Sequence, residues 1–379
     1  MYQIIHIVKY QVIIVGGGLA GLTAAIHLSK ENIKVLLIEK NKYPQHKVCG
    51  EYISNEVLPY LKKLGFDPFD HGAKKITNLT ISTATNRTIS AELPLGGFGI
   101  SRYCIDEALA TKAKSYGAEI IHDTVTDIQY SNDEFVIKTN TNNYKSTLTI
   151  GAFGKRSNLD KKLSRAFINQ SSPYLAVKAH YQGEFPDDQV SLHNFRGGYC
   201  GLSKVENGLI NVCYITDYKS FKKYKNIEEF QNKVISQNKF LNDAFRNFKI
   251  TFDNPMTISQ VSFASKKPIE NHMLMCGDSA GMIHPLAGNG MSMAIRSGQM
   301  ASQLILDYYN KKVENRHDLE SAYQKAWKKE FQSRLNAGHI IARLFKINIL
   351  SDIAIILLKL VPSLLPLIIK KTHGKPMKT

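Results

Sequence analysis

Cysteine is scarce in this chain, and its spacing argues against several cysteine-based architectures. There are five cysteines, an odd number, and no two of them form a CxxC pair. A disulfide framework, a zinc ribbon and a cysteine-held iron–sulfur cluster are therefore poorly supported, and we predict no metal site. The first residues also lack the charged start and small-residue cleavage site of a signal peptide. We therefore expect a cytoplasmic protein in a reducing compartment.

Acidic residues are scarce relative to basic ones. The 379 residues include 49 Lys and Arg but only 32 Asp and Glu, which gives a formal net charge of +17. This excess favours anionic partners, either nucleic acid or acidic lipid. No nucleic-acid-binding motif accompanies it, so we expect no nucleic-acid partner. The content of 43% hydrophobic residues excludes a disordered chain, and the length predicts two domains.

The N-terminal part has the order of elements found in a dinucleotide-binding unit. Tyr10 to Val15 is a β-branched run typical of a buried parallel strand, Leu19 to Lys30 has helical spacing, and Lys34 to Ile38 predicts a second strand. Between the first strand and the helix stands GGGLAG, residues 16–21, which matches G-x-G-x-x-G. The sequence therefore predicts a Rossmann-type α/β fold.

Each glycine of this fingerprint has a physical role. Gly16 permits the tight turn, Gly18 lets a pyrophosphate approach the backbone, and Gly21 lets the helix pack against the strand. The helix start offers free N–H groups to phosphate, and Glu39, at the end of the second strand, can accept from ribose hydroxyls. The fingerprint alone does not distinguish FAD from NAD. The predicted cofactor contacts in this unit are Gly16, Gly18, Leu19, Ala20, Gly21, Glu39 and Lys40.

A second motif allows two interpretations. Gly277-Asp278-Ser279-Ala280-Gly281 follows an apolar strand and matches G-x-S-x-G, the nucleophile elbow of serine esterases. That interpretation makes Ser279 a nucleophile and requires an acid and a histidine on later strands. However, the chain after Gly290 predicts only helices, and no HGGG-type oxyanion motif precedes the elbow. The esterase therefore stays a remote alternative.

The other interpretation is a resemblance to a known family. GDSAGMIHPLAGNGMSMAIRSG resembles the second FAD motif of the glutathione-reductase-like flavoproteins, which include geranylgeranyl reductases, aromatic-ring monooxygenases and flavin halogenases. The sequence looks closest to the geranylgeranyl reductase branch. The resemblance implies that Asp278 holds the ribityl chain of FAD and that a helix N-terminus stabilises the reduced flavin. The residues it places at the ribityl chain and the isoalloxazine are Gly277, Asp278, Pro285, Gly288, Gly290 and Met291.

Other segments agree with this resemblance. The segment HKVCGE, residues 46–51, resembles the CGE segment of geranylgeranyl reductases and implies that Lys47 and Cys49 lie at the cofactor. Arg102 resembles the family's arginine near the pyrophosphate, and Val125 stands where the family's backbone contacts adenine. Cys49 is also the one weak candidate for a catalytic residue, with a small packing residue as the alternative.

The chain departs from the family at two places. Phe153 replaces an aspartate that in the hydroxylases serves the flavin and NADPH, which weakens the case for direct reduction by NAD(P)H. The family's Tyr-x-Trp-x-Phe-Pro strand becomes YCGLSK, residues 199–204, which implies a roomier substrate wall. The halogenase Trp-x-Trp-x-Ile-Pro pattern is absent, since Trp327 is the only tryptophan.

Several short strands in the middle of the chain predict a separate antiparallel sheet that contacts substrate. His193, Tyr199 and Cys200 lie on these strands and are candidate substrate contacts, although each has an even chance of facing away. We expect a discontinuous FAD-binding domain at 1–75, 100–175 and 262–312. The substrate domain would occupy 76–99 and 176–261, and a helical region 313–379.

The C-terminal segment 347–369 is rich in Ile and Leu and is followed by several lysines. Asp352 and Lys359 interrupt the run, and Pro362 and Pro366 would bend a helix, so a spanning helix is disfavoured. Two alternatives remain open at this point. The segment lies in the interface of an acidic membrane, or it packs on the enzyme itself.

These observations together predict an FAD-dependent oxidoreductase with a lipophilic substrate, such as an isoprenoid, a polyketide or a quinone-like molecule. Double-bond reduction, as in geranylgeranyl reductases, is the first hypothesis, and hydroxylation by an FAD-dependent monooxygenase is the second. A non-catalytic flavin- or lipid-binding protein is a further alternative. The electron donor would be NAD(P)H or a separate reductase, and the protein would be cytoplasmic or peripheral at the inner face of the membrane.

Overall fold

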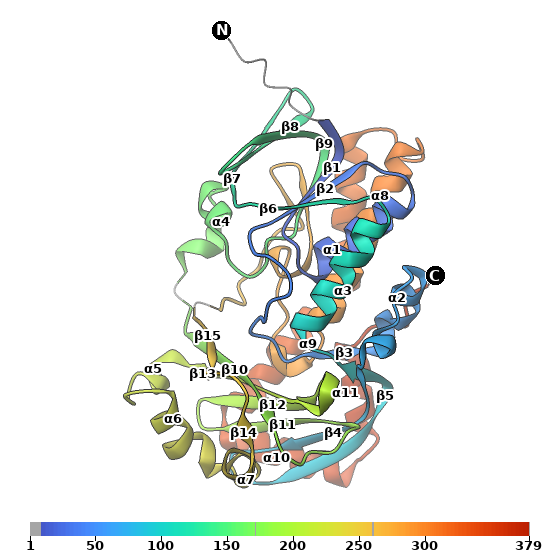
Figure 1. Cartoon of the computed structure of the whole chain (residues 1–379). Helices are drawn as coiled ribbons and strands as arrows, with labels where there is room; N and C mark the ends of the chain where they lie inside the picture. The colour runs from blue at the N-terminus through green and yellow to red at the C-terminus, as the bar shows by residue number, and fades with distance from the viewer. Residues whose placement is uncertain (1–8, 171, 260, 379) are drawn as a thin grey trace.

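The computed structural model of this chain describes residues 9–170, 172–259 and 261–378. It contains two β-sheets, one above the other in Figure 1. The first sheet is mixed. Its central strands pair in parallel, as the apolar runs at Tyr10–Val15 and Val35–Ile38 predict, because both faces of these strands are buried. Its strands follow the order β16 (Ile269–Glu270), β17 (Met273–Met275), β9 (Asn143–Gly151), β1 (Lys9–Val15), β2 (Val35–Glu39) and β6 (Glu119–His122), while β8 (Glu134–Thr139) and β7 (Val125–Ser131) continue from β9.

Helices cover the first sheet and form one core with it. α1 (Leu19–Lys30) packs between α3 (Arg102–Ser115) and α8 (Gly290–Tyr309), and α9 (Arg316–Lys346) packs on α8. α1 has the predicted bounds, and α8, like α1, begins at a glycine-rich turn. Trp327 and Phe331 of α9 are buried in this core. The short helices α2 (Leu58–Lys63) and α4 (Asn158–Lys162) complete this unit.

The second sheet is antiparallel except at one pair, β11 with β4. The strand β3 belongs to it, although its residues fall in the segment expected for the FAD-binding domain. The long hairpin of β4 and β5 was not predicted. The sheet follows the order β14 (Lys249–Ile250), β10 (Tyr174–Gln182), β13 (Ile210–Asp217), β12 (Gly198–Lys204), β11 (Gln189–Phe195), β4 (Lys74–Ser82), β5 (Thr88–Gly99) and β3 (Tyr52–Ser54), and β15 (Met256–Ser259) also pairs with β10.

The two faces of the second sheet meet different partners. One face, which carries Val177, Cys200 and Tyr214, packs against α6 (Ile227–Lys233) and α7 (Lys239–Asn247), with α5 (Tyr218–Phe221) nearby. Asn238 separates α6 from α7, because it ends one turn and caps the next helix. The other face, with Ala176 and Tyr199, meets the FAD-motif loop at Met282.

The C-terminal region packs on the same face as this loop, at the other end of the second sheet. α10 (Asn348–Leu360) and α11 (Leu364–Thr372) bury Leu358, Leu365 and Ile369 against β4, β5 and β11. The two helices meet at an angle of 118°. Pro362 stands at their junction, as predicted, whereas Pro366 is tolerated in the first turn of α11.

A buried carboxylate joins the two sheets. Glu51 accepts hydrogen bonds from Lys178 Nζ at 2.6 Å and from the backbone N–H of Arg102 at 2.7 Å, and its second oxygen pairs with His180 Nε2 at 2.7 Å. All three side chains are buried. Burial acts to raise the pKa of Glu51, but the Lys178 ammonium and the His180 hydrogen bond hold it below its ordinary value.

We expect Lys178→Met to lower the free energy of unfolding by about 3–5 kcal/mol, because it removes the ammonium group that pairs with the buried Glu51 charge. Urea unfolding measures this loss. Lys9→Met is the matched control, since Lys9 is 62% exposed in its pair with Glu134 and such pairs contribute at most about 1 kcal/mol. Equal losses for the two variants would contradict the prediction.

The same carboxylate predicts a pH dependence. Since the pKa of Glu51 is lowered by folding, its contribution to stability is complete above the ordinary carboxyl pKa and is lost as pH falls through the folded value. The double variant Glu51→Gln/Lys178→Met lacks this titration. We therefore expect the stability difference between wild type and double variant to be constant near neutral pH and to change only in acid.

Candidate functional site

The fingerprint loop has the geometry that its glycines predict. Gly16 has a φ of +107°, and a Cβ there would overlap the carbonyl oxygen of Ala152. A Cβ at Gly21 would overlap the carbonyl of Gly16. Gly18 is the N-cap of α1 and makes no side-chain cap, so the N–H groups at Leu19 and Ala20 begin the helix uncapped. Free N–H groups at a helix start suit a phosphate.

An arginine side chain lies next to Gly18. A Cβ at Gly18 would lie 3.6 Å from Nη2 of Arg102, the first residue of α3. Asp106, one turn later, accepts from Arg102 Nε at 2.8 Å and Nη2 at 2.7 Å and also from Lys47 Nζ at 2.9 Å. The carboxylate therefore fixes the guanidinium next to the fingerprint and brings in Lys47 as a second cation.

Glu39 and Tyr43 hold the fingerprint loop from the side. Glu39 Oε2 accepts from the N–H of Gly17 at 2.8 Å, and the Tyr43 hydroxyl donates to the carbonyl of Gly17 at 2.7 Å. Tyr43 was not singled out from the sequence, because its position depends on the loop that follows β2. Lys40 is exposed and makes no hydrogen bond or ion pair with any residue that the structure describes.

The predicted adenine-side residue lies at the same sheet edge. The ring of His122, at the end of β6, is 5.7 Å from the ring of Tyr43, and the N–H of Asp123 donates to the carbonyl of Glu39 at 3.1 Å. Val125 begins β7 just after this turn and is half-buried. The chain thus passes Glu39 immediately before it reaches Val125.

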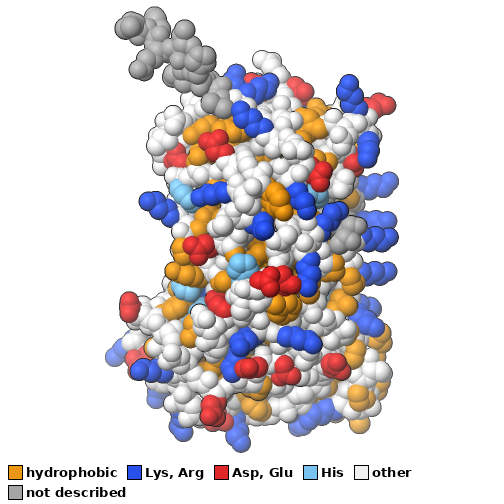
Figure 2. Space-filling view, turned by 45° about the vertical axis from the view of Figure 1, so that its right-hand side comes forward, with side chains coloured by type: hydrophobic (Ala, Val, Ile, Leu, Met, Phe, Trp, Pro, Cys, Tyr) orange, Lys and Arg blue, Asp and Glu red, His pale blue; other side chains and the backbone are white. Residues whose placement is uncertain are grey.

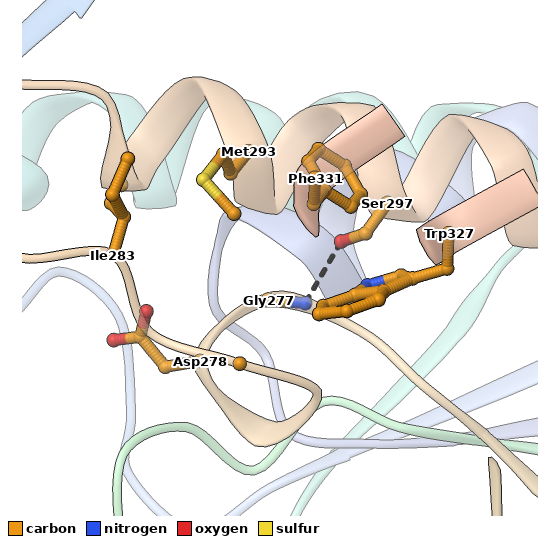
Figure 3. A pocket seen from close by; sticks show the side chains of 9 residues that line it. Gly277, Asp278, Ile283, Met293, Ser297, Trp327 and Phe331 are labelled. Carbon is orange, nitrogen blue, oxygen red and sulfur yellow. Dashed lines mark hydrogen bonds between the residues drawn. The ribbon is translucent and has the colours of Figure 1, made fainter. Parts of the chain in front are cut away.

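The second motif forms the loop between β17 and α8. Gly277 has a φ of +60°, and its N–H donates to Ser297 Oγ of α8 at 2.8 Å. Figure 3 shows this bond beside Trp327 and Phe331, with the Asp278 carboxylate pointing away from these two rings. A Cβ at Gly277 would lie 3.3 Å from Cβ of Ala20. The two motifs, about 260 residues apart, are therefore in contact.

The loop ends at the N-terminus of α8. Pro285 begins a short 3-10 turn, and Gly288 closes it with a φ of +63°. Met291, in the first turn of α8, lies against Cys49, with the two sulfur atoms 3.4 Å apart. The structure thus brings the CGE segment to the helix that begins at Gly290, as the family resemblance implies.

The esterase alternative is wrong. Ser279 is buried, and its hydroxyl is bonded to the backbone of Gly154, accepting from N–H at 2.8 Å and donating to the carbonyl at 3.2 Å. No histidine that the structure describes bonds to it, and the turn is followed by a loop rather than directly by a helix. The motif instead contacts the fingerprint loop, as its interpretation as an FAD motif requires.

The expectation that His193 and Cys200 line the substrate side is also wrong. His193 bonds through Nδ1 to Ser82 Oγ at 2.8 Å and stacks on Phe240 of α7, and Cys200 packs with the α6 and α7 cluster. Neighbouring residues of a strand alternate between faces, so only Tyr199 turns towards the FAD motifs. Burial lowers the pKa of His193 to about 4, so it is a neutral core histidine.

Other residues on the cofactor side were missed. Lys178, His180 and Asn211 lie on the face that carries Ala176, and the Asn211 amide donates to the carbonyls of Cys49 and Gly50 at 3.3 and 2.8 Å. The sequence of β10 does indicate that Lys178 and His180 share a face, because they alternate with buried apolar residues. It does not reveal the partner that neutralises the lysine.

A glycine-rich phosphate loop, an arginine opposite it and an uncapped helix at the flavin end define the class as an FAD-dependent oxidoreductase. Comparison with known proteins agrees. Residues 9–326 match the FAD binding domain family, and the chain belongs to it. The residues present fit the cofactor, since the uncapped N–H groups at the start of α1 lie beside the Arg102 guanidinium, and both suit a pyrophosphate.

Curated relatives include reductases from methanogens. The chain is 25% identical to digeranylgeranylglycerophospholipid reductase 1 of Methanosphaera stadtmanae, over 84% of this chain and 80% of that protein. It is also 25% identical to the digeranylgeranylglycerophospholipid reductase of Methanosarcina acetivorans, over 89% and 84% of the two chains.

Solved structures share the fold. The flavin-dependent brominase Bmp2 superposes with a TM-score of 0.81 at 18% identity, over 98% of this chain and 95% of that one. A geranylgeranyl bacteriochlorophyll reductase-like protein of Thermoplasma acidophilum superposes with a TM-score of 0.72 at 18% identity, over 89% and 88%. These identities establish the fold alone.

We expect Gly18→Ala to weaken FAD binding by roughly tenfold or more, because the methyl group occupies space that the pyrophosphate needs. The fold should tolerate it, since the nearest atom is the end of the Arg102 side chain. Titration of apoprotein with FAD measures the dissociation constant. Lys30→Ala, at the opposite end of α1, is the control, and an unchanged constant for Gly18→Ala would contradict the assignment.

Proposed function

We propose that the chain uses FAD to reduce carbon–carbon double bonds in a lipophilic molecule of the isoprenoid, polyketide or quinone-like class. A buried apolar cluster beside the cofactor loop carries this proposal. Ala176, Tyr199 and Ile215 of the second sheet pack there against Met282, and the partly buried Val48 and Leu286 join them. Apolar surroundings of this kind favour a hydrocarbon substrate over a charged one.

Titratable side chains at this surface are unsuited to acid–base chemistry. Burial lowers the pKa of His284 to about 4 and raises the pKa of Tyr199 well above its ordinary value. Both groups are therefore neutral near pH 7. Bound FAD supplies hydride transfer, and the surrounding residues orient the substrate and exclude water.

Double-bond reduction is favoured over hydroxylation by two observations. Reductases of digeranylgeranylglycerophospholipids are among the curated relatives. In addition, Phe153 packs against the core where the hydroxylases carry an aspartate. An electron donor other than directly bound NAD(P)H, such as a separate reductase, fits this substitution best.

The experiment is anaerobic reoxidation of the FAD-loaded protein. The flavin is reduced with dithionite and mixed with geranylgeraniol in detergent, and both the visible absorption of oxidised flavin and the mass of the product are followed. We expect reoxidation without oxygen and a product that gains two hydrogen atoms. Reoxidation only by oxygen, with an oxygen atom in the product, would establish the monooxygenase instead.

We also propose that the lipophilic substrate is met at an acidic membrane surface, which α10 and α11 contact. No single helix in the described ranges is long and apolar enough to cross a bilayer, and the α10–α11 pair passes that test only as a bent unit. One stripe of this pair is buried, but large apolar side chains cover its outer surface. The exposed residues are Ile349, Leu350, Ile353, Ile356, Leu357, Leu360, Val361, Leu364, Leu367 and Ile368.

Charge favours an acidic lipid as the partner of this surface. Lys346, Lys359, Lys370 and Lys371 are exposed around it, whereas Asp352 is the one acid in α10 and α11 and is bonded to Thr85. Basic side chains elsewhere are spread over the visible face in Figure 2 rather than gathered in a channel. Apolar side chains ringed by lysines are typical of peripheral binding at the inner face of a membrane.

The second sheet provides an apolar connection from this surface to the cofactor loop. Leu192 of β11 packs both with the cluster that holds Leu358 and Leu365 and with the cluster that holds Tyr199 and Met282. A hydrocarbon chain that leaves the bilayer near α11 would therefore follow apolar side chains towards the flavin.

We expect Ile353→Glu/Leu357→Glu to lower binding to phosphatidylglycerol vesicles by roughly tenfold or more, because both side chains are about half exposed on one face of α10. Vesicle cosedimentation measures this loss. Ile250→Glu, an exposed isoleucine on β14, is the control. Wild-type binding by the double variant, or a wild-type dimer that buries this face without lipid, would contradict the proposal.

A further inference from the structure

The last residues of the described chain return to the FAD-binding unit. After α11 the chain leaves the second sheet and runs beside α2, where the C-terminus lies in Figure 1. We name residues 372–378 the strap. Met377 is buried in the core of the first sheet, and its N–H donates to the carbonyl of Glu56 at 2.8 Å. Gln299 of α8 donates to the carbonyl of Lys378 at 3.2 Å.

Close packing fixes the middle of the strap. A Cβ at Gly374 would overlap the Glu56 carboxylate and the Arg334 guanidinium, which pair with each other at 3.3 Å. Both side chains are buried. Only a glycine fits between them, so the strap can bind this unit in only one position.

The strap begins next to the flavin end of the site. Asn289, which is fully buried, donates from Nδ2 to the carbonyl of Thr372 at 2.7 Å. Asn289 is also the N-cap residue of α8. Asparagine is among the best N-caps, because its side-chain oxygen accepts from the second or third N–H of the helix. Here the side chain makes no such bond, and its Oδ1 has no partner in the described chain.

We propose that the strap completes the cofactor site by holding Asn289 away from the N-terminus of α8. The first-turn N–H groups, from Gly290 onward, then stay free of a side-chain cap and available to the flavin. If the strap leaves, Oδ1 of Asn289 turns to cap its own helix and competes with the cofactor for the same donors. The inference rests on FAD binding and not on the identity of the substrate.

The test compares FAD-loaded full-length protein with a chain truncated after Lys371, which removes the whole strap and with it the Thr372 carbonyl that binds Asn289. We expect the truncated chain to bind FAD roughly five- to tenfold more weakly, the factor that corresponds to one competing N-cap hydrogen bond. Reduced flavin should lose more affinity than oxidised flavin, because it carries the charge that the helix N-terminus stabilises. A tenfold difference between the two forms lowers the midpoint potential by about 30 mV.

Asn289→Ala in the truncated chain distinguishes competition between Asn289 and the flavin from a general loosening of the fold. If Asn289 competes with the flavin, removing its side chain restores the affinity and the potential, whereas a merely loosened fold gains nothing. Lys375→Ala, an exposed position within the strap, is the matched control. Should the truncated chain fail to fold, Met377→Lys in the full chain displaces the strap instead.

Two results would overturn the proposal. One is an unchanged FAD affinity and potential after the strap is removed or displaced. The other is a loss of affinity that Asn289→Ala does not restore. Neither result uses the substrate, so failure of double-bond reduction and failure of this inference are separate outcomes.

Discussion

The two halves of the molecule depend on one buried carboxylate. Glu51 caps the first turn of α3, next to the predicted pyrophosphate site, and pairs with Lys178 and His180 of the second sheet. Its backbone has a φ of +55°, which few residues other than glycine adopt. A buried charge is costly unless it is paired. The carboxylate of Glu51 and the ammonium group of Lys178 therefore each need the other half of the molecule. The relative position of the cofactor loop and the second sheet follows from this constraint.

With that position set, the chain has little acid–base chemistry to perform. Neutral groups such as His284 and Tyr199 and apolar side chains such as Met282 surround the flavin end, and the helix start at Gly290 provides the fixed dipole. This division explains why no pair of catalytic carboxylates is evident. The cofactor carries the reaction, and the protein contributes position and exclusion of water.

The FAD motifs could be predicted because their turns depend on local sequence. Features that depend on contacts between distant residues could not be predicted. The turns at Gly16 and Gly277 need only neighbouring backbone, so the sequence indicates them directly. The face on which His193 lies depends on the register of β11 between β12 and β4, which no single strand encodes. Lys178 could be seen as a polar residue in an apolar strand, but its partner Glu51 is 127 residues away. The hairpin of β4 and β5 escaped prediction because its alternation is weak and Pro94 and two glycines interrupt it.

The C-terminal region packs on the enzyme along one stripe, and its opposite surface carries the membrane contact that we propose. A sheet face can cover only one stripe of a helix, so Leu358, Leu365 and Ile369 are buried while Ile353 and Leu357 remain outside. The same chain then continues as the strap and reaches Asn289 at the start of α8. The C-terminal helices and the cofactor loop are thus linked twice, through the apolar contacts of Leu192 and through the backbone itself. Any displacement of α11 must therefore act on the strap, since the strap continues directly from Thr372, the last residue of α11.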